Sequence, residues 1–128
     1  MTLSLPGRVP SKKNSKRWLK FGARMALVPS AQFNAWHEEM MLRVRRYRPK
    51  KPIQQAKVAI TFFAETRRNF DLTNAAESVM DLLVDAEILA DDSWSVVPEV
   101  TLTFGGVETK NPRAEIQITP DVEKLINV

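Results

Sequence analysis

Residues 57–86 read KVAITFFAETRRNFDLTNAAESVMDLLVDA, and this stretch decides the fold. From Lys57 to Glu65 apolar side chains occupy every second position, which is the period-two pattern of a β-strand. From Asp71 to Ala86 they recur every three or four positions instead, which predicts a helix with one apolar stripe: Leu72, Ala75, Ala76, Val79, Leu82, Leu83 and Ala86. A strand followed by a helix that packs on its sheet is therefore the expected centre of the fold.

Shorter elements flank this centre on both sides. Ser30 can cap a helix that runs to about Arg48, just before Pro49. The remaining patterns predict a strand at residues 3–5, a hairpin at 18–28, a pair of antiparallel strands at 96–104 and 113–119, and a short helix at 120–126. The expected fold class is α+β: a single domain of residues 1–128 with a mixed or antiparallel sheet of about four strands and two main helices packed on it.

Composition excludes several kinds of site. The chain has no cysteine and a single histidine, His37, so disulfides and thiolate metal sites are excluded and any metal must be held mainly by oxygen ligands. The first residues have no charged and apolar leader pattern, and no stretch approaches the roughly 18 apolar residues that span a bilayer. We therefore expect a cytoplasmic protein that has no contact with a membrane and no organic cofactor.

Charge is distributed unevenly along the chain. Residues 1–57 carry 14 Lys or Arg against two Glu, whereas residues 71–92 carry seven carboxylates and no Lys or Arg. A cationic surface attracts a polyanion, and clustered carboxylates repel one unless divalent cations lie between them. This combination is what a metal-dependent nuclease needs. A solvated acidic helix face beside an unrelated basic surface is the alternative explanation.

The carboxylates have a regular spacing on the expected helix. Glu77, Asp81 and Asp85 are four residues apart and fall, with Asn74, on the face opposite the apolar stripe, while Asp71 lies at the helix start. Repulsion between neighbouring carboxylates costs only a few tenths of a kcal/mol per pair, which a helix tolerates without a bound cation. Asp71 also has a purely structural explanation as a helix N-cap.

A longer motif is more specific. It consists of Arg67-Arg68-Asn69-Phe70-Asp71-Leu72-Thr73-Asn74, then Asp81-Leu82-Leu83, then Ile88-Leu89-Ala90-Asp91-Asp92-Ser93-Trp94. This pattern resembles the RusA family of Holliday-junction resolvases, in which a basic stretch precedes Asp-Leu-Asp-Asn at a helix start and an Asp-Asp pair follows a hydrophobic turn. Leu5-Pro6 with Pro10-Ser11 and Asn14 resembles the family's early loop. The resemblance extends from about residue 3 to 119 and is strongest from 67 to 94.

The resemblance implies a homodimeric endodeoxyribonuclease that cuts four-way DNA junctions with Mg²⁺, or with Mn²⁺ in its place. Its catalytic and metal-ligating residues would be Asp71, Glu77 and Asp92, with Asp91 as a further ligand and with Thr73, Asn74 and Asp81 in the outer shell. A near-twofold junction would be nicked by two identical sites, leaving 5′-phosphate and 3′-hydroxyl ends. A compact resolvase of this kind fits a phage or prophage.

Two positions depart from the family pattern. Thr73 stands where the second Asp of Asp-Leu-Asp-Asn is a metal ligand, and Glu77 stands where the family has an essential Lys. One helical turn separates the two positions, so that Glu77 can return a carboxylate to the same face while the Thr73 hydroxyl or a water fills the vacated place. The missing cation would be supplied by Arg67, Arg68, Lys12 or Lys13.

Basic residues near the motif and the early loop are the candidates for DNA contact: Lys12, Lys13, Asn14, Lys16, Arg17, Arg67 and Arg68. Trp18, Trp36 and Trp94 can stack on bases or fill a core, and core is the preferred role of Trp36. Two other functions fit the same sequence. A relative that binds junctions without cutting them would bind independently of Mg²⁺, and a small basic scaffold or regulatory protein would not distinguish four-way from linear DNA.

Overall fold

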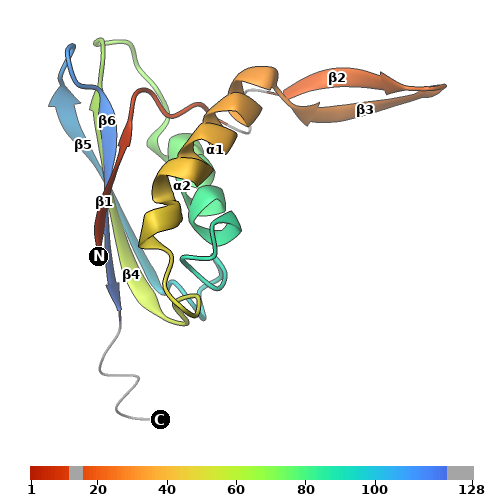
Figure 1. Cartoon of the computed structure of the whole chain (residues 1–128). Coiled ribbons are helices and arrows are strands. Elements are labelled where there is room, and N and C mark those ends of the chain that lie inside the picture. The colour runs from red at the N-terminus through yellow and green to blue at the C-terminus, as the bar shows by residue number, and fades with distance from the viewer. Residues whose placement is uncertain (12–15, 121–128) are drawn as a thin grey trace.

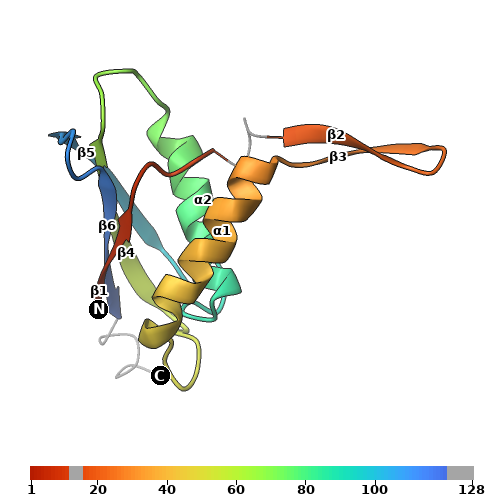
Figure 2. The same ribbon diagram turned by 45° about the horizontal axis from the view of Figure 1, so that its top comes forward.

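A mixed four-stranded sheet carries two helices on one face, and a two-stranded hairpin projects away from them (Figures 1 and 2). The computed structural model describes residues 1–11 and 16–120. Their elements are β1 (Thr2–Pro6), β2 (Lys16–Phe21), β3 (Arg24–Pro29), α1 (Ala31–Val44), the 3-10 helix η1 (Arg45–Tyr47), β4 (Ala56–Ala64), α2 (Leu72–Asp85), β5 (Glu99–Val107) and β6 (Arg113–Pro120). The predicted α+β fold is confirmed. Of the helix predicted at 120–126, Pro120 instead ends β6, and the other residues lie outside the described residues.

The strand order of the large sheet is β1-β6-β4-β5. β6 runs antiparallel to both β1 and β4, whereas β5 runs parallel to β4. The prediction that the last two strands pair with each other is therefore wrong, because β4 lies between them. The connection through α2 explains the difference: two parallel neighbours need a crossover, and the helix supplies it. This topology leaves β5 at the edge of the sheet.

The start of β5 also differs from the prediction. Val96 and Val97 were expected to begin the strand, but they are buried in a turn whose two N–H groups donate to the Ser93 carbonyl at 3.0 and 2.8 Å. The strand begins at Glu99. Val96 and Val97 resemble the start of a strand in the sequence because they are apolar, but they are apolar because they are part of the core.

Helix α1 begins and ends for local reasons. The Ser30 hydroxyl accepts from the Phe33 N–H at 3.1 Å, and Phe33, Trp36, Met40 and Val44 are buried at three- and four-residue spacings. The predicted continuation to Arg48 is a 3-10 turn, because a residue before proline is pushed out of the helical region and Arg48 is extended. His37 on α1 lies 2.9 Å from an oxygen of Asp85 on α2, which connects the two helices.

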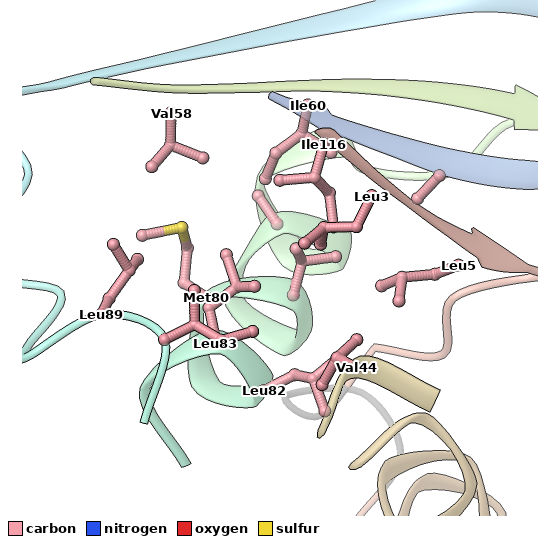
Figure 3. Close-up of a cluster of buried hydrophobic side chains, with 14 of the residues drawn as sticks. Leu3, Leu5, Val44, Val58, Ile60, Met80, Leu82, Leu83, Leu89 and Ile116 are labelled. Carbon is pink, nitrogen blue, oxygen red and sulfur yellow. The ribbon is translucent and has the colours of Figure 1, made fainter. Parts of the chain in front are cut away.

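The core lies between the sheet and the helices (Figure 3). Leu3 and Leu5 of β1 and Ile60 of β4 point toward Leu82 and Leu83 of α2, and all five are at most 2% exposed. Burial of a side chain of this size contributes about 1.5–3 kcal/mol relative to exposure. The core therefore fixes α2 against the sheet. It thereby also fixes the direction of the acidic motif, which runs along α2 from Asp71 toward Asp91 and Asp92.

The predicted hairpin forms as β2 and β3, with Gly22 in its turn at φ 62°. It leaves large apolar side chains in solvent: Trp18 is 64% exposed, Phe21 56%, Met25 55% and Leu27 50%. Its described charged side chains, Lys20 and Arg24, are both basic. Two strands without a third are only marginally stable in water. The hairpin therefore presents an apolar and cationic surface to solvent.

Among residues 1–11 and 16–120, no helix has the length and hydrophobicity needed to cross a bilayer.

Candidate functional site

Asp71 is the N-cap of α2. Its Oδ1 atom accepts from the Thr73 N–H at 2.9 Å, from the Thr73 hydroxyl at 2.6 Å and from the Asn74 N–H at 3.4 Å. The free N–H groups and the dipole of a helix start both favour a negative charge there. The N-cap role read from the sequence is confirmed, and it fixes the orientation of the Asp71 carboxylate.

A groove of about 580 Å³ opens beside Asp71. Its lining comes from four parts of the chain: residues 7–11, residues 62–71 without Arg67, the start of α2 with Asn74 and Ala75, and Pro112 with Arg113; Gln32 of α1 completes it. Arg8 and Arg68 are exposed at this groove. Two carboxylate residues, Glu65 and Asp71, and three arginines thus share one concave surface, and arginines are suited to binding a phosphate group.

Arg113 is the most constrained of the three arginines. Its guanidinium pairs with Glu108 and, at 2.8 Å, with Glu115, and it lies 3.9 Å above the centre of the Phe63 ring. Hydrogen bonds to Glu108 and then Glu115 raise the pKa of Arg113 above its usual value. Neither Arg113 nor Arg8 was among the site residues predicted from the sequence. The only sequence signal for Arg8 is its position within the family-like loop, between Leu5-Pro6 and Pro10-Ser11.

Ser78 holds one wall of the groove in place. It is fully buried in α2, and its hydroxyl donates to the Pro10 carbonyl at 2.6 Å. This hydrogen bond joins the segment of residues 7–11 to the helix that carries Asp71. No local pattern indicates this contact, because the two residues are 68 positions apart.

We expect Ser78→Ala to lower the free energy of unfolding by about 1–3 kcal/mol, because a buried carbonyl loses its donor. Urea denaturation measures the loss. Ser4→Ala, at an exposed position of β1, is the matched control and should change stability by less than about 0.5 kcal/mol. Equal effects of the two substitutions would mean that the Ser78–Pro10 hydrogen bond does not stabilise the fold.

The other carboxylates of α2 lie farther along the helix. Glu77 is exposed one turn beyond Thr73, Asp81 is half-buried, and Asp85 makes the contact with His37. Glu77 and Thr73 therefore lie near each other on the helix surface, as the sequence analysis expected.

Asp91 and Asp92 lie in an exposed turn beyond the opposite end of α2. The Asp91 Oδ1 atom accepts from the Asp92 N–H at 2.9 Å, and this hydrogen bond, followed by one from the Ser93 hydroxyl, lowers the pKa of Asp91. The preceding residues are anchored: the Ala90 N–H donates to the Ile53 carbonyl at 3.0 Å, just before β4. Trp94 is 81% exposed beside the pair.

The two parts of the acidic motif are therefore far apart in one chain. Asp71 lies where β4 ends and α2 begins, whereas Asp91 and Asp92 lie where α2 ends and β4 begins. The 14 residues of α2 span roughly 20 Å. Within the described part of the chain, no three carboxylate or histidine side chains come close enough together to hold a metal ion. The site residues predicted from the sequence thus form two groups.

The predicted DNA contacts are spread over two regions. Arg67 and Arg68 are exposed in the loop before α2, and Arg68 lines the groove. Lys16 and Arg17 begin β2. Lys12, Lys13 and Asn14 lie outside the described residues.

Comparison with known families gives one result. The model of the family described as endodeoxyribonuclease RusA matches residues 6–119, which is most of the chain. The match includes the groove, α2 and the turn with Asp91 and Asp92. No curated protein matches the chain. This chain belongs to the RusA endodeoxyribonuclease family, and membership implies Holliday-junction resolvase activity.

Proposed function

We propose that this protein is a Mg²⁺-dependent, structure-specific endonuclease that resolves four-way DNA junctions by paired phosphodiester hydrolysis. It acts as a homodimer in DNA recombination and repair, in the cytoplasm. The observation that carries the proposal is the groove in which Asp71 and Asn74 lie beside Arg8, Arg68 and Arg113, within the region that matches the family.

The residues of the groove have distinct tasks in this proposal. Arg8 and Arg68 bind the DNA backbone on either side of the cut by charge-assisted hydrogen bonds to phosphate oxygens. Arg113, held by its ion pairs with Glu108 and Glu115, forms a fixed part of the groove's wall. Thr73 orients the Asp71 carboxylate through its 2.6 Å hydrogen bond.

Divalent metal dependence is supported by family membership and by the number of carboxylates in the motif. A bound Mg²⁺ would lower the pKa of a water molecule and offset charge at the scissile phosphate. The proposed ligands are Asp71, Glu77, Asp92 and Asp91. The described residues of a single chain do not fit this ligand set, because Asp71 and Asp92 lie at opposite ends of α2.

The hairpin of β2 and β3 supplies a second contact with DNA in this proposal. Lys20 and Arg24 are exposed on it together with Trp18, a combination suited to phosphates and to an unstacked base at the branch point.

The double variant Lys20→Ala with Arg24→Ala should weaken binding to junctions, because two phosphate contacts are lost. The slope of log K against log salt should fall by about 2. Titration of a fluorescent junction at several salt concentrations measures it. Lys50→Ala with Lys51→Ala removes the same charge beyond the C-terminal end of α1 and should leave the slope unchanged. An equal decrease for both pairs would mean that the hairpin has no special role.

Cleavage of an end-labelled synthetic four-way junction tests the proposal directly. We expect symmetric nicks near the branch point with Mg²⁺, none with a chelator, and none in a linear duplex of the same sequence. Tight junction binding with no nick in Mg²⁺ or Mn²⁺ would show instead that Thr73 and Glu77 mark an active site that has lost its catalytic activity. Equal affinity for four-way and linear DNA would favour the alternative function of a small basic scaffold or regulatory protein.

A further inference from the structure

A second hollow adjoins the groove at the loop that precedes α2. Its volume is about 340 Å³, and we call it the side pocket. The residues that line it are Thr66, Arg67, Arg68, Asn69, Phe70, Leu72, Phe104 and Val107. Thr66, Arg68, Asn69 and Phe70 also line the groove that contains Asp71. The two hollows therefore share one wall, which is the loop of residues 66–70.

Two aromatic rings in a fixed orientation line the side pocket. Phe104 of β5 is 48% exposed, and Phe70 of the loop is 38% exposed. The Phe70 ring meets the Phe104 ring at 64° and the buried Phe62 ring at 77°, with ring centres 6.1 and 6.0 Å apart. Edge-to-face contacts of this kind restrict the rings while leaving part of their surface open. Such rings are suited to stacking against a flat ligand such as a nucleobase.

The remaining lining of the side pocket is cationic and polar. Arg67 and Arg68 are exposed, and no carboxylate residue is among the described residues that line it. The Arg68 N–H donates to the Thr66 hydroxyl at 3.3 Å, which holds the loop in a turn. Asn69 is exposed, and its amide carries both donors and an acceptor. Arginines suit phosphates and an amide suits the edge of a base, so this lining fits a nucleotide of DNA.

We propose that the side pocket receives one nucleobase of the four-way junction, unstacked from its neighbours beside the phosphate that is cut. Phe104 and Phe70 stack on this base, Asn69 hydrogen-bonds to its edge, and Arg67 binds the adjoining phosphate. The proposal rests on the proposed function and deepens it, because it names the residues that select branched over linear DNA.

The selectivity follows from the cost of removing a base from the helix. Extrusion of a base breaks its stacking and pairing, and the cost is smallest where these contacts are already weakened. Strands pass from one helix to another at a branch point, so the bases there are the most readily unstacked. A linear duplex offers no such base. The side pocket therefore adds affinity for junctions alone, whereas the arginines attract the backbone of either DNA.

Binding titrations in the presence of a chelator test the side pocket without requiring cleavage. Phe104→Leu removes a ring but keeps an apolar side chain, at a position that lines the side pocket and not the groove. It should weaken binding of a fluorescent four-way junction at least fivefold and change binding of a linear duplex less than twofold. Phe104→Tyr keeps the ring and should stay within twofold of the parent protein for both DNAs.

The matched control for these titrations is Val100→Ala. Val100 is 43% exposed on the same face of β5 but does not line the side pocket, so both affinities should be unchanged. Equal losses of junction and duplex binding in Phe104→Leu would overturn the proposal. Equal affinity of the parent protein for the two DNAs would also overturn it.

Fluorescence of a base analogue locates the extruded base. Stacking quenches 2-aminopurine, so its emission reports unstacking when it replaces one base at a time close to the branch point. With the chelator present, binding of the parent protein should raise the emission at least twofold at one position, and Phe104→Leu should remove most of that rise. No rise at any position, or an equal rise with Phe104→Leu at saturating protein, would contradict the side pocket.

Failure of the side pocket and failure of the proposed function give different results. Parent protein that passes the titration and fluorescence tests but never nicks junctions in Mg²⁺ would refute the nuclease and leave the side pocket standing. If Phe104→Leu both bound and nicked junctions as the parent protein does, the nuclease would stand and the side pocket would be refuted.

Discussion

Asp71→Asn should abolish cleavage of four-way junctions while leaving the fold and junction binding intact. Asn and Asp are equally good helix N-caps, so the substitution keeps the caps on the Thr73 and Asn74 N–H groups and removes only the charge. In the proposed function Asp71 would hold a metal ion that supplies several kcal/mol of charge stabilisation at the reacting phosphate, so loss of its charge corresponds to a decrease of about 100- to 1000-fold in rate. Single-turnover cleavage of a labelled junction measures it.

Two controls separate chemistry from stability in this experiment. Asp71→Ala removes the cap as well as the charge and should also lower the free energy of unfolding by about 1 kcal/mol. Glu38→Gln removes a carboxylate from an exposed position of α1 and should leave the rate unchanged. If Asp71→Asn cut junctions at the parental rate, Asp71 would be a structural cap and no more.

Leu83→Ala should destabilise the protein more than any other single change considered. Leu83 is completely buried between α2 and the sheet, and its carbonyl also accepts the Ile88 and Leu89 N–H groups at 3.0 and 3.1 Å. Truncation of a buried leucine costs about 2–5 kcal/mol through lost apolar burial and the cavity left behind. Thermal and urea unfolding followed by circular dichroism measure the change.

Leu42→Ala makes the same chemical change at a residue of α1 that is 67% exposed. It should alter stability by less than about 0.5 kcal/mol, because little apolar surface is lost. A loss at Leu83 no larger than at Leu42 would mean that α2 does not pack on the sheet as described.

The sequence predicts the centre of this fold well because each element there has a strong period of its own. β4 and α2 lie within one residue of their expected bounds, and Asp71 caps the N-terminus of α2 as predicted. The partner of β5 could not be predicted in the same way, since alternation identifies a strand but not its neighbour. The Ser78 contact with Pro10 and the groove position of Arg113 depend on tertiary packing and leave no local signal.

The candidate site was predicted as a set of residues but not as an arrangement in space. The spacing from Asp71 to Asp92 suggested one cluster, yet a helix of 14 residues lies between them and separates them by roughly 20 Å. That separation could have been calculated from the predicted helix alone.

The most direct test of the central claim is incubation of the parent protein and Mg²⁺ with a supercoiled plasmid that extrudes a cruciform. A resolvase with two sites incises both strands at the four-way junction, so we predict conversion to linear DNA with ends at the cruciform and little open circle. The same plasmid without the inverted repeat should stay supercoiled. Plasmid that is bound but uncut, or is merely nicked at random positions, would contradict the claim.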